Sequence, residues 1–174
     1  GSEGAAAVWR TKTGNDAWEQ MKVDNSTGTS YGYERYYWGA FLNGKVYMQA
    51  RGTNPATPMR VYDTAAGTWS DSTVTISNYS GTMVDTFDNH IVYTNGSSVN
   101  MFDGDETVTT KTLPNSELVR DLTKYDGKLY VLTYSGKIFS MASANSDPVL
   151  LGTASGAATS PTTIALYDNY IYLG

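Results

Sequence analysis

The chain has 174 residues, a formal net charge of −5 and no cysteine. Its length suits one domain of ordinary size. The missing cysteine excludes disulfides, thiolate metal sites and cysteine nucleophiles. Nucleic acid binding needs clustered Lys and Arg side chains to neutralise phosphates. The basic residues of this chain are scattered, so the sequence argues against a nucleic acid partner. No apolar run of about 18 residues, the length expected of a membrane-spanning helix, occurs in the sequence.

The N-terminal part predicts a β-hairpin. Residues 7–11 and 17–23 read as two strands, and a turn at residues 13–16 joins them. This pairing would place Trp9 and Trp18 opposite or nearly opposite one another. The composition agrees with many short strands, since Tyr, Gly, Ser, Thr and Asn are frequent and only 17% of the residues are charged. No segment shows a convincing helical period, so we predict an all-β protein.

The strongest hairpin signal lies in residues 41–47 (FLNGKVY), because Asn-Gly favours a two-residue turn. Similar stretches follow at residues 87–93, 125–130 and 167–172. Each stretch has a tyrosine near the head of its second strand: Tyr47, Tyr93, Tyr130 and Tyr172. A four-stranded unit repeated every 40 or so residues is typical of β-propeller blades, which must stack to bury both sheet faces.

The strand pattern predicts one β-propeller domain over residues 1–174. Three antiparallel four-stranded blades cover approximately residues 33–73, 81–115 and 116–153. The fourth blade is split, with two strands from residues 161–174 and two from residues 7–23. Pairing of these N- and C-terminal strands closes a ring of four blades, at the lower limit of the known range. The alternatives are a piece of a larger propeller and a ring shared by two chains.

Two hairpins resemble known propeller repeats. Residues 61–70 (VYDTAAGTWS) resemble the kelch repeat, in which Tyr-Asp, a turn and Trp join the third and fourth strands of a blade. Residues 8–18 (VWRTKTGNDAW) are similar, and they also resemble the Asp-box hairpin of sialidase-like propellers. The kelch double glycine is missing from every unit. The resemblance implies a propeller and no single activity, since this fold hosts both enzymes and adaptors.

The sequence offers little for catalysis, and we predict no catalytic residues. His90 is the only histidine, which excludes a His-rich metal site, and we interpret it as a polar turn residue. Galactose-oxidase-like copper chemistry would also need cysteine. Sialidase-like chemistry needs converging arginines, whereas Arg35 and Arg120, on expected innermost strands, more readily pair with carboxylates. We expect no cofactor, although Asp85 and Asp121 could hold a channel cation such as calcium through oxygen ligands. The alternative to a bound cation is that each of these two carboxylates is solvated or paired with an arginine.

Aromatic side chains gather at residues 31–38. Tyr31, Tyr33 and Trp38, together with Arg35 and Arg120, are the candidate ligand-binding residues, because exposed rings stack on sugars and anchor protein partners. Trp38 and its neighbours could instead belong to the core between blades. The acidic balance argues against membrane adsorption.

We therefore predict a non-catalytic binding or assembly module, extracellular or on the cell surface. Its partner would be a protein or a glycan recognised through the propeller loops, and self-association stays open. The competing predictions are a carbohydrate-active enzyme and a truncated or engineered propeller without activity of its own. A converging cluster of Arg, Asp and Glu with perturbed pKa values at the channel mouth would favour the enzyme.

Overall fold

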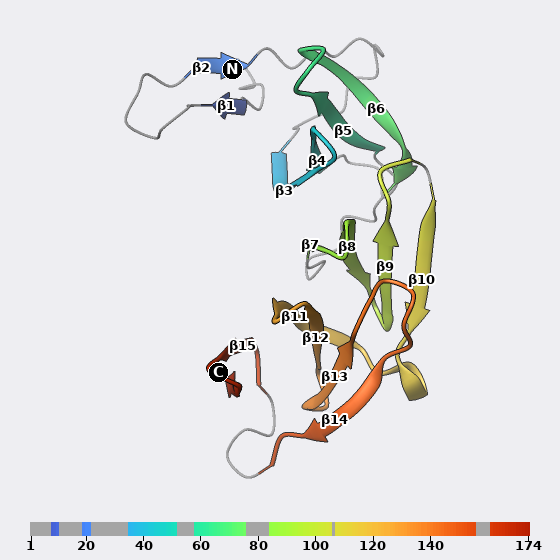
Figure 1. The fold of residues 1–174 in the computed structure, drawn as a ribbon, viewed down its shortest axis with the longest axis vertical. Coiled ribbons are helices and arrows are strands. Elements are labelled where there is room, and N and C mark those ends of the chain that lie inside the picture. The colour runs from blue at the N-terminus through green and yellow to red at the C-terminus, as the bar shows by residue number, and fades with distance from the viewer. Residues whose placement is uncertain are drawn as a thin grey trace, which may run out of the picture. The chain divides into compact units, whose positions relative to one another are not determined.

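The structure is a computed structural model that describes residues 8–10, 19–21, 35–51, 58–75, 84–105, 107–155 and 161–174 (Figure 1). The elements are β1 (Val8–Arg10), β2 (Glu19–Met21), β3 (Arg35–Leu42), β4 (Lys45–Arg51), β5 (Pro58–Asp63), β6 (Thr68–Thr75), β7 (Val84–Phe87), β8 (His90–Asn95), β9 (Ser98–Phe102), β10 (Val108–Thr112), the 3-10 helix η1 (Pro114–Ser116), β11 (Val119–Tyr125), β12 (Lys128–Thr133), β13 (Lys137–Met141), β14 (Val149–Thr153), β15 (Ile164–Tyr167) and β16 (Tyr170–Leu173). No helix in this described part is long and apolar enough to cross a membrane.

The strands form antiparallel sheets whose strand order follows the chain. The sheets β3–β6, β7–β10 and β11–β14 have four strands each, whereas β1–β2 and β15–β16 are two-stranded. The all-β prediction and the four-stranded antiparallel sheets are confirmed. The chain falls into two compact units, one of residues 1–39 and 44–78 and the other of residues 40–43 and 79–174. The described pairings do not join β1 or β2 to β16, so ring closure stays a prediction.

The repeated hairpins turn through two residues in the left-handed region. In these four hairpins, the positive φ angles are those of Asn43 and Gly44, Asp88 and Asn89, Asp126 and Gly127, and Asp168 and Asn169. Two adjacent residues with positive φ define the type I′ turn, whose twist matches that of the flanking strands. The tight turn predicted at Asn43-Gly44 is confirmed, and the three related stretches turn in the same way.

The turns also correct the predicted register of the repeat. Tyr47, Tyr130 and Tyr172 each stand three residues after the second turn residue, and Val92 holds that position in the second sheet. Tyr93 is one residue further along, and successive residues of a strand point to opposite faces. Tyr93 is therefore not the equivalent of the other three tyrosines.

The predicted N-terminal hairpin forms between β1 and β2. Trp9 pairs with Gln20, and Arg10 pairs with Glu19. Trp18, the expected partner of Trp9, lies outside the described residues. The described parts of these strands lie within the predicted ranges 7–11 and 17–23.

The hairpin that resembles the kelch repeat is held by its aspartate. The Asp63 carboxylate accepts hydrogen bonds from the backbone N–H groups of Ala65 and Ala66, both at 2.9 Å. These bonds lower the pKa of Asp63. Tyr62 lies opposite Trp69, with ring centroids 5.0 Å apart. The Tyr-Asp, turn and Trp pattern thus has a structural role in this sheet.

Neighbouring sheets of the second unit pack face to face. The main core includes Phe87 and Val92 from the sheet β7–β10, and Leu129 and Phe139 from the sheet β11–β14. A second core joins Leu132 and Ile138 of the sheet β11–β14 to β15–β16. The sheet β11–β14 therefore buries both of its faces, as a propeller blade must.

Candidate functional site

The predicted ligand-binding residues of the first repeat are only partly described. Arg35 and Trp38 lie in β3, where the structure describes their backbone. Tyr31 and Tyr33 lie outside the described residues. These four assignments stay predictions, and the site is built below from the residues of the second unit.

Asp85 connects two neighbouring sheets. Its carboxylate lies 3.1 Å from the Lys124 ammonium, which also donates to the carbonyl and the hydroxyl of Thr86. Asp85 comes from β7 and Lys124 from β11, the first strands of their sheets. A lysine at this distance disfavours a metal ion on the same carboxylate, because both cations compete for it.

Asp121 connects the next two sheets in a similar way. Its Oδ2 atom accepts hydrogen bonds from the Thr163 hydroxyl at 2.8 Å and from the Ile164 N–H at 3.0 Å. Its Oδ1 atom accepts from the N–H of Leu122. The carboxylate thus ties β11 to the beginning of β15.

Asp85 and Asp121 therefore have different partners in the structure. The described residues contain no group of three or more His, Cys, Asp or Glu side chains that could hold a metal ion. The predicted channel cation stays a prediction, and the geometry gives each carboxylate a tethering role between sheets.

Arg120 lies elsewhere, half-buried near the beginning of β11. Its guanidinium carbon is 4.6 Å from the ring centroid of Tyr134, a cation–π distance. Tyr134 is 53% exposed and Leu118 is 54% exposed. We call Leu118, Arg120 and Tyr134 the recognition surface. It combines an aliphatic group, an aromatic ring and a fixed positive charge.

Backbone hydrogen bonds hold the recognition surface. The N–H of Tyr134 donates to the carbonyl of Leu118 at 3.0 Å, which joins the β12–β13 turn to the loop before β11. The N–H of Val119 donates to the carbonyl of Gly96, in the β8–β9 turn, at 2.8 Å. The exposed groups therefore stand on a fixed backbone, which lowers the entropic cost of binding.

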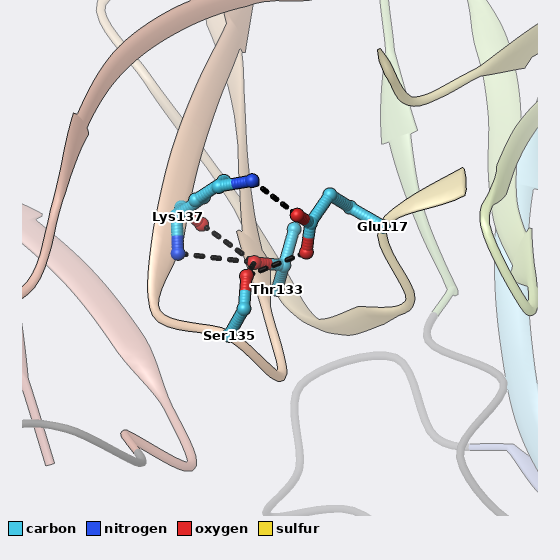
Figure 2. Close-up of polar contacts among 4 residues, drawn as sticks. All are labelled: Glu117, Thr133, Ser135 and Lys137. Atoms are coloured by element: carbon cyan, nitrogen blue, oxygen red, sulfur yellow. Dashed lines mark hydrogen bonds and ion pairs between the residues drawn. The ribbon is translucent and has the colours of Figure 1, made fainter. Parts of the chain in front are cut away.

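A polar network supports the same turn (Figure 2). Glu117 accepts hydrogen bonds from the Lys137 ammonium and from the Ser135 hydroxyl, the latter at 2.5 Å. The Thr133 hydroxyl accepts from the Lys137 N–H at 3.0 Å. The hydrogen bond from Lys137 is the main cause that lowers the pKa of Glu117, and the hydrogen bond from Ser135 is the second. Both carboxylate oxygens of Glu117 thus accept a hydrogen bond within this network.

Among the recognition residues, the sequence interpretation singled out Arg120 and missed the others. Leu118 and Tyr134 sit in short connections that resemble many others in the chain. The only sequence signal for Tyr134 was an aromatic residue immediately before the Ser135-Gly136 turn. Leu118 and Tyr134 are candidate binding residues because they are exposed. Their exposure depends on how the neighbouring sheets pack, which the sequence does not reveal.

Comparison with known proteins identifies the fold alone. No protein-family model matches the chain, and no curated protein matches it. The computationally designed Ika4 protein has a TM-score of 0.52 and 17% identity, over 82% of this chain and 86% of that one.

Two natural structures are also similar. A chain of the S. cerevisiae complex of Dbp5 bound to Nup159 and Gle1 has a TM-score of 0.55 and 12% identity, over 75% of this chain and 36% of its own length. A luciferin-regenerating enzyme has a TM-score of 0.55 and 16% identity, over 90% of this chain and 58% of that one. These natural neighbours are β-propeller-like, and none of the matches shows a kelch or Asp-box family. The chain is thus similar to β-propellers.

Proposed function

We propose that this protein is a non-catalytic propeller module that binds a protein partner, outside the cell or on its surface, through the recognition surface of Leu118, Arg120 and Tyr134. The observation that carries the proposal is that the candidate catalytic acids and the exposed candidate binding residues lie in different places and have different roles. Asp85 and Asp121, the acids that an enzyme would need, hold sheets together. Leu118 and Tyr134 are instead exposed, and the half-buried Arg120 lies against the Tyr134 ring. An aromatic ring and an arginine are side-chain types that anchor protein interfaces.

The similar structures are compatible with a binding function, but they do not decide between binding and catalysis. One is a complex in which Nup159 and Gle1 are bound to Dbp5, and another is an enzyme. The fold therefore accommodates both functions, and function has to be argued from the site. A glycan is a second candidate ligand, because a rigid exposed tyrosine also stacks on sugar rings.

The blade count is part of the same proposal. Residues 7–23 would supply the outer strands of the blade that β15 and β16 begin. A ring of four blades results when both ends belong to one chain. A larger ring results when the ends belong to different chains.

Binding is tested by comparing variants that alter the recognition surface. Wild-type protein and Tyr134→Ala would be used as baits for extracellular proteins, with retained proteins quantified by mass spectrometry and glycans surveyed on an array. We expect specific partners to lose at least tenfold in retention with Tyr134→Ala. Lys128→Ala, an exposed change at the other end of β12, is the matched control and should retain them. Equal retention by both variants would contradict the proposal.

The enzyme alternative has its own test. We expect no turnover of a panel of glycosides by the purified protein. Turnover that disappears in Asp85→Asn or Asp121→Asn, with the fold intact by circular dichroism, would overturn the non-catalytic assignment.

A further inference from the structure

Arg120 is the extra residue of a β-bulge. In the register of β11 with β12, Val119 pairs with Thr133, and the next pair is Asp121 with Leu132. Arg120 therefore lies between two paired positions and has no partner of its own in β12. A bulge changes the direction of a side chain relative to the regular alternation of a strand. The direction of the Arg120 side chain is thus set by an irregularity in the backbone of β11.

The Arg120 side chain lies over the ring of Tyr134. Its guanidinium carbon is 4.6 Å from the ring centroid, and the Tyr134 N–H donates to the carbonyl of Leu118. An aromatic ring attracts a cation through its quadrupole but does not neutralise the charge. A guanidinium carries five N–H donors in one plane, a geometry that matches a carboxylate. Arg120 is therefore a positioned cation that suits an anionic group.

Arg120 has no carboxylate partner among the described residues. The two acids nearest to it in the sequence use both carboxylate oxygens elsewhere, Asp121 in the tether to β15 and Glu117 in the network of Figure 2. A half-buried cation without a counter-charge has lost part of its hydration, and an anion from a partner would offset that loss. Four other basic side chains of the described part do form ion pairs, namely Arg60, Lys111, Lys124 and Lys137.

The charge of the whole chain narrows the kind of anion. With a net charge of −5, the chain repels a polyanion or a long run of acidic residues. A single carboxylate beside an apolar group experiences less of this repulsion. It also matches the surface, where Arg120 lies with the exposed side chains of Leu118 and Tyr134. A protein segment supplies both groups from neighbouring residues.

We propose that the recognition surface binds a segment of a partner protein in which one Asp or Glu stands beside an apolar residue. The carboxylate pairs with the Arg120 guanidinium through two parallel hydrogen bonds, the arrangement that arginine favours. The apolar side chain lies against Leu118 and the exposed ring of Tyr134. The inference rests on the proposed protein-binding function and adds the chemistry of the partner.

A phage-displayed library of random dodecapeptides is the probe. We expect peptides selected on the wild-type protein to share one Asp or Glu next to a Leu, Ile, Phe or Tyr. Arg120→Gln removes the charge and should weaken the binding of these peptides at least tenfold. Lys128→Gln is the matched control, because Lys128 is an exposed cation at the other end of β12, and it should bind them as wild type does.

The peptide is then varied together with the protein. Replacing its acidic residue by the corresponding amide should weaken binding to wild type by the same factor as Arg120→Gln does. The amide peptide and the acidic peptide should bind Arg120→Gln equally, because the charge pair is already lost. Arg120→Lys retains the charge without the planar fork, and should give an intermediate affinity. Circular dichroism verifies that each variant is folded, and Arg120→Lys alone carries the comparison if Arg120→Gln is not.

Three results would overturn the proposal. Selection of no peptide, or of peptides that bind wild type and Arg120→Gln equally, means that Arg120 does not take a carboxylate. Equal losses in Arg120→Gln and Lys128→Gln mean that the chain attracts acidic peptides without a site. Retention of acidic sugars in place of peptides, dependent on Arg120, assigns the surface to a glycan.

The same variants separate this inference from the proposed function. If partner proteins or peptides are lost with Tyr134→Ala but retained by Arg120→Gln, the recognition surface binds protein and only the acidic chemistry is wrong. If Tyr134→Ala also retains them, the recognition surface is wrong, and the proposed function is overturned with it.

Discussion

The sheets β11–β14 and β15–β16 are built from the same repeat, yet within the described part of the chain only the first buries both of its faces. Both begin with a strand, a type I′ turn and a second strand, and their first strands are tied together by Asp121. The sheet β11–β14 packs against β7–β10 on one side and β15–β16 on the other. Among the described residues, the sheet β15–β16 has a neighbouring sheet on one side, and β16 pairs with β15 alone.

This difference separates two sources of stability. Hairpin formation is local, because the turn residues with positive φ and the alternating strands specify it. Burial is not local, because each sheet relies on the sheets before and after it. An apolar residue in a propeller repeat is therefore a core residue or an exposed contact surface according to its neighbours.

The largest effect is expected from two equivalent aromatic residues. Phe87→Ala should lower the free energy of unfolding by about 3–5 kcal/mol, because it leaves a cavity in the main core. Tyr167→Ala, at the equivalent exposed position, should change it by less than about 0.5 kcal/mol in dilute, monomeric protein. Chemical denaturation measures both changes.

The two costs test the comparison directly, because Tyr167 is 73% exposed whereas Phe87 is 6% exposed. Equal costs for the two variants in a strictly monomeric protein would mean that Tyr167 is buried within a single chain.

A smaller effect is expected from the tether between the two sheets. Asp121→Ala removes the acceptor of the Thr163 hydroxyl and the Ile164 N–H, and should cost about 1–3 kcal/mol. Amide hydrogen exchange should speed up in β15 and remain unchanged in β8. Asp147→Ala, which removes an exposed pair with Lys111, is the control and should have no measurable effect. Uniform acceleration across both strands would show that Asp121 supports the whole unit rather than the tether.

The smallest effect is expected from the pH dependence of the turn beneath the recognition surface. Hydrogen bonds from Lys137 and Ser135 hold the pKa of Glu117 below its ordinary value of 4.5. A carboxylate with a lowered folded-state pKa contributes stability above the unfolded pKa, and this contribution is lost as pH falls through the folded pKa.

Glu117→Gln should therefore be less stable than wild type at pH 7, and the difference should shrink below about pH 4.5. Unfolding midpoints measured between pH 7 and pH 3 follow the change. Ser135→Ala, which retains the ion pair, should reduce the pH dependence less. A difference that stays constant over the whole range would mean that Glu117 is not ionised in this network.

Local features of the sequence predicted the repeating elements well. Asn43-Gly44 and its three relatives specified the turns, and period-two strands specified antiparallel sheets. The kelch-like pattern at residues 61–70 corresponds to a real hairpin, because an aspartate that caps its own turn is a short-range interaction. Register was less certain. Tyr93 looked like a repeat tyrosine, and a one-residue offset between turn and strand is not visible without the turn geometry.

The sequence by itself determined the all-β class, the four type I′ hairpins and the grouping of strands into four-stranded units. Those features depend on contacts between residues close together in the chain. Only the tertiary structure decided that Asp85 and Asp121 tether sheets, that Arg120 lies over the Tyr134 ring, and that Tyr167, Tyr170 and Tyr172 are exposed. The tethers join side chains from separate sheets, and the contact of Arg120 with Tyr134 joins residues that are not adjacent in the sequence, so neither can be read from local sequence.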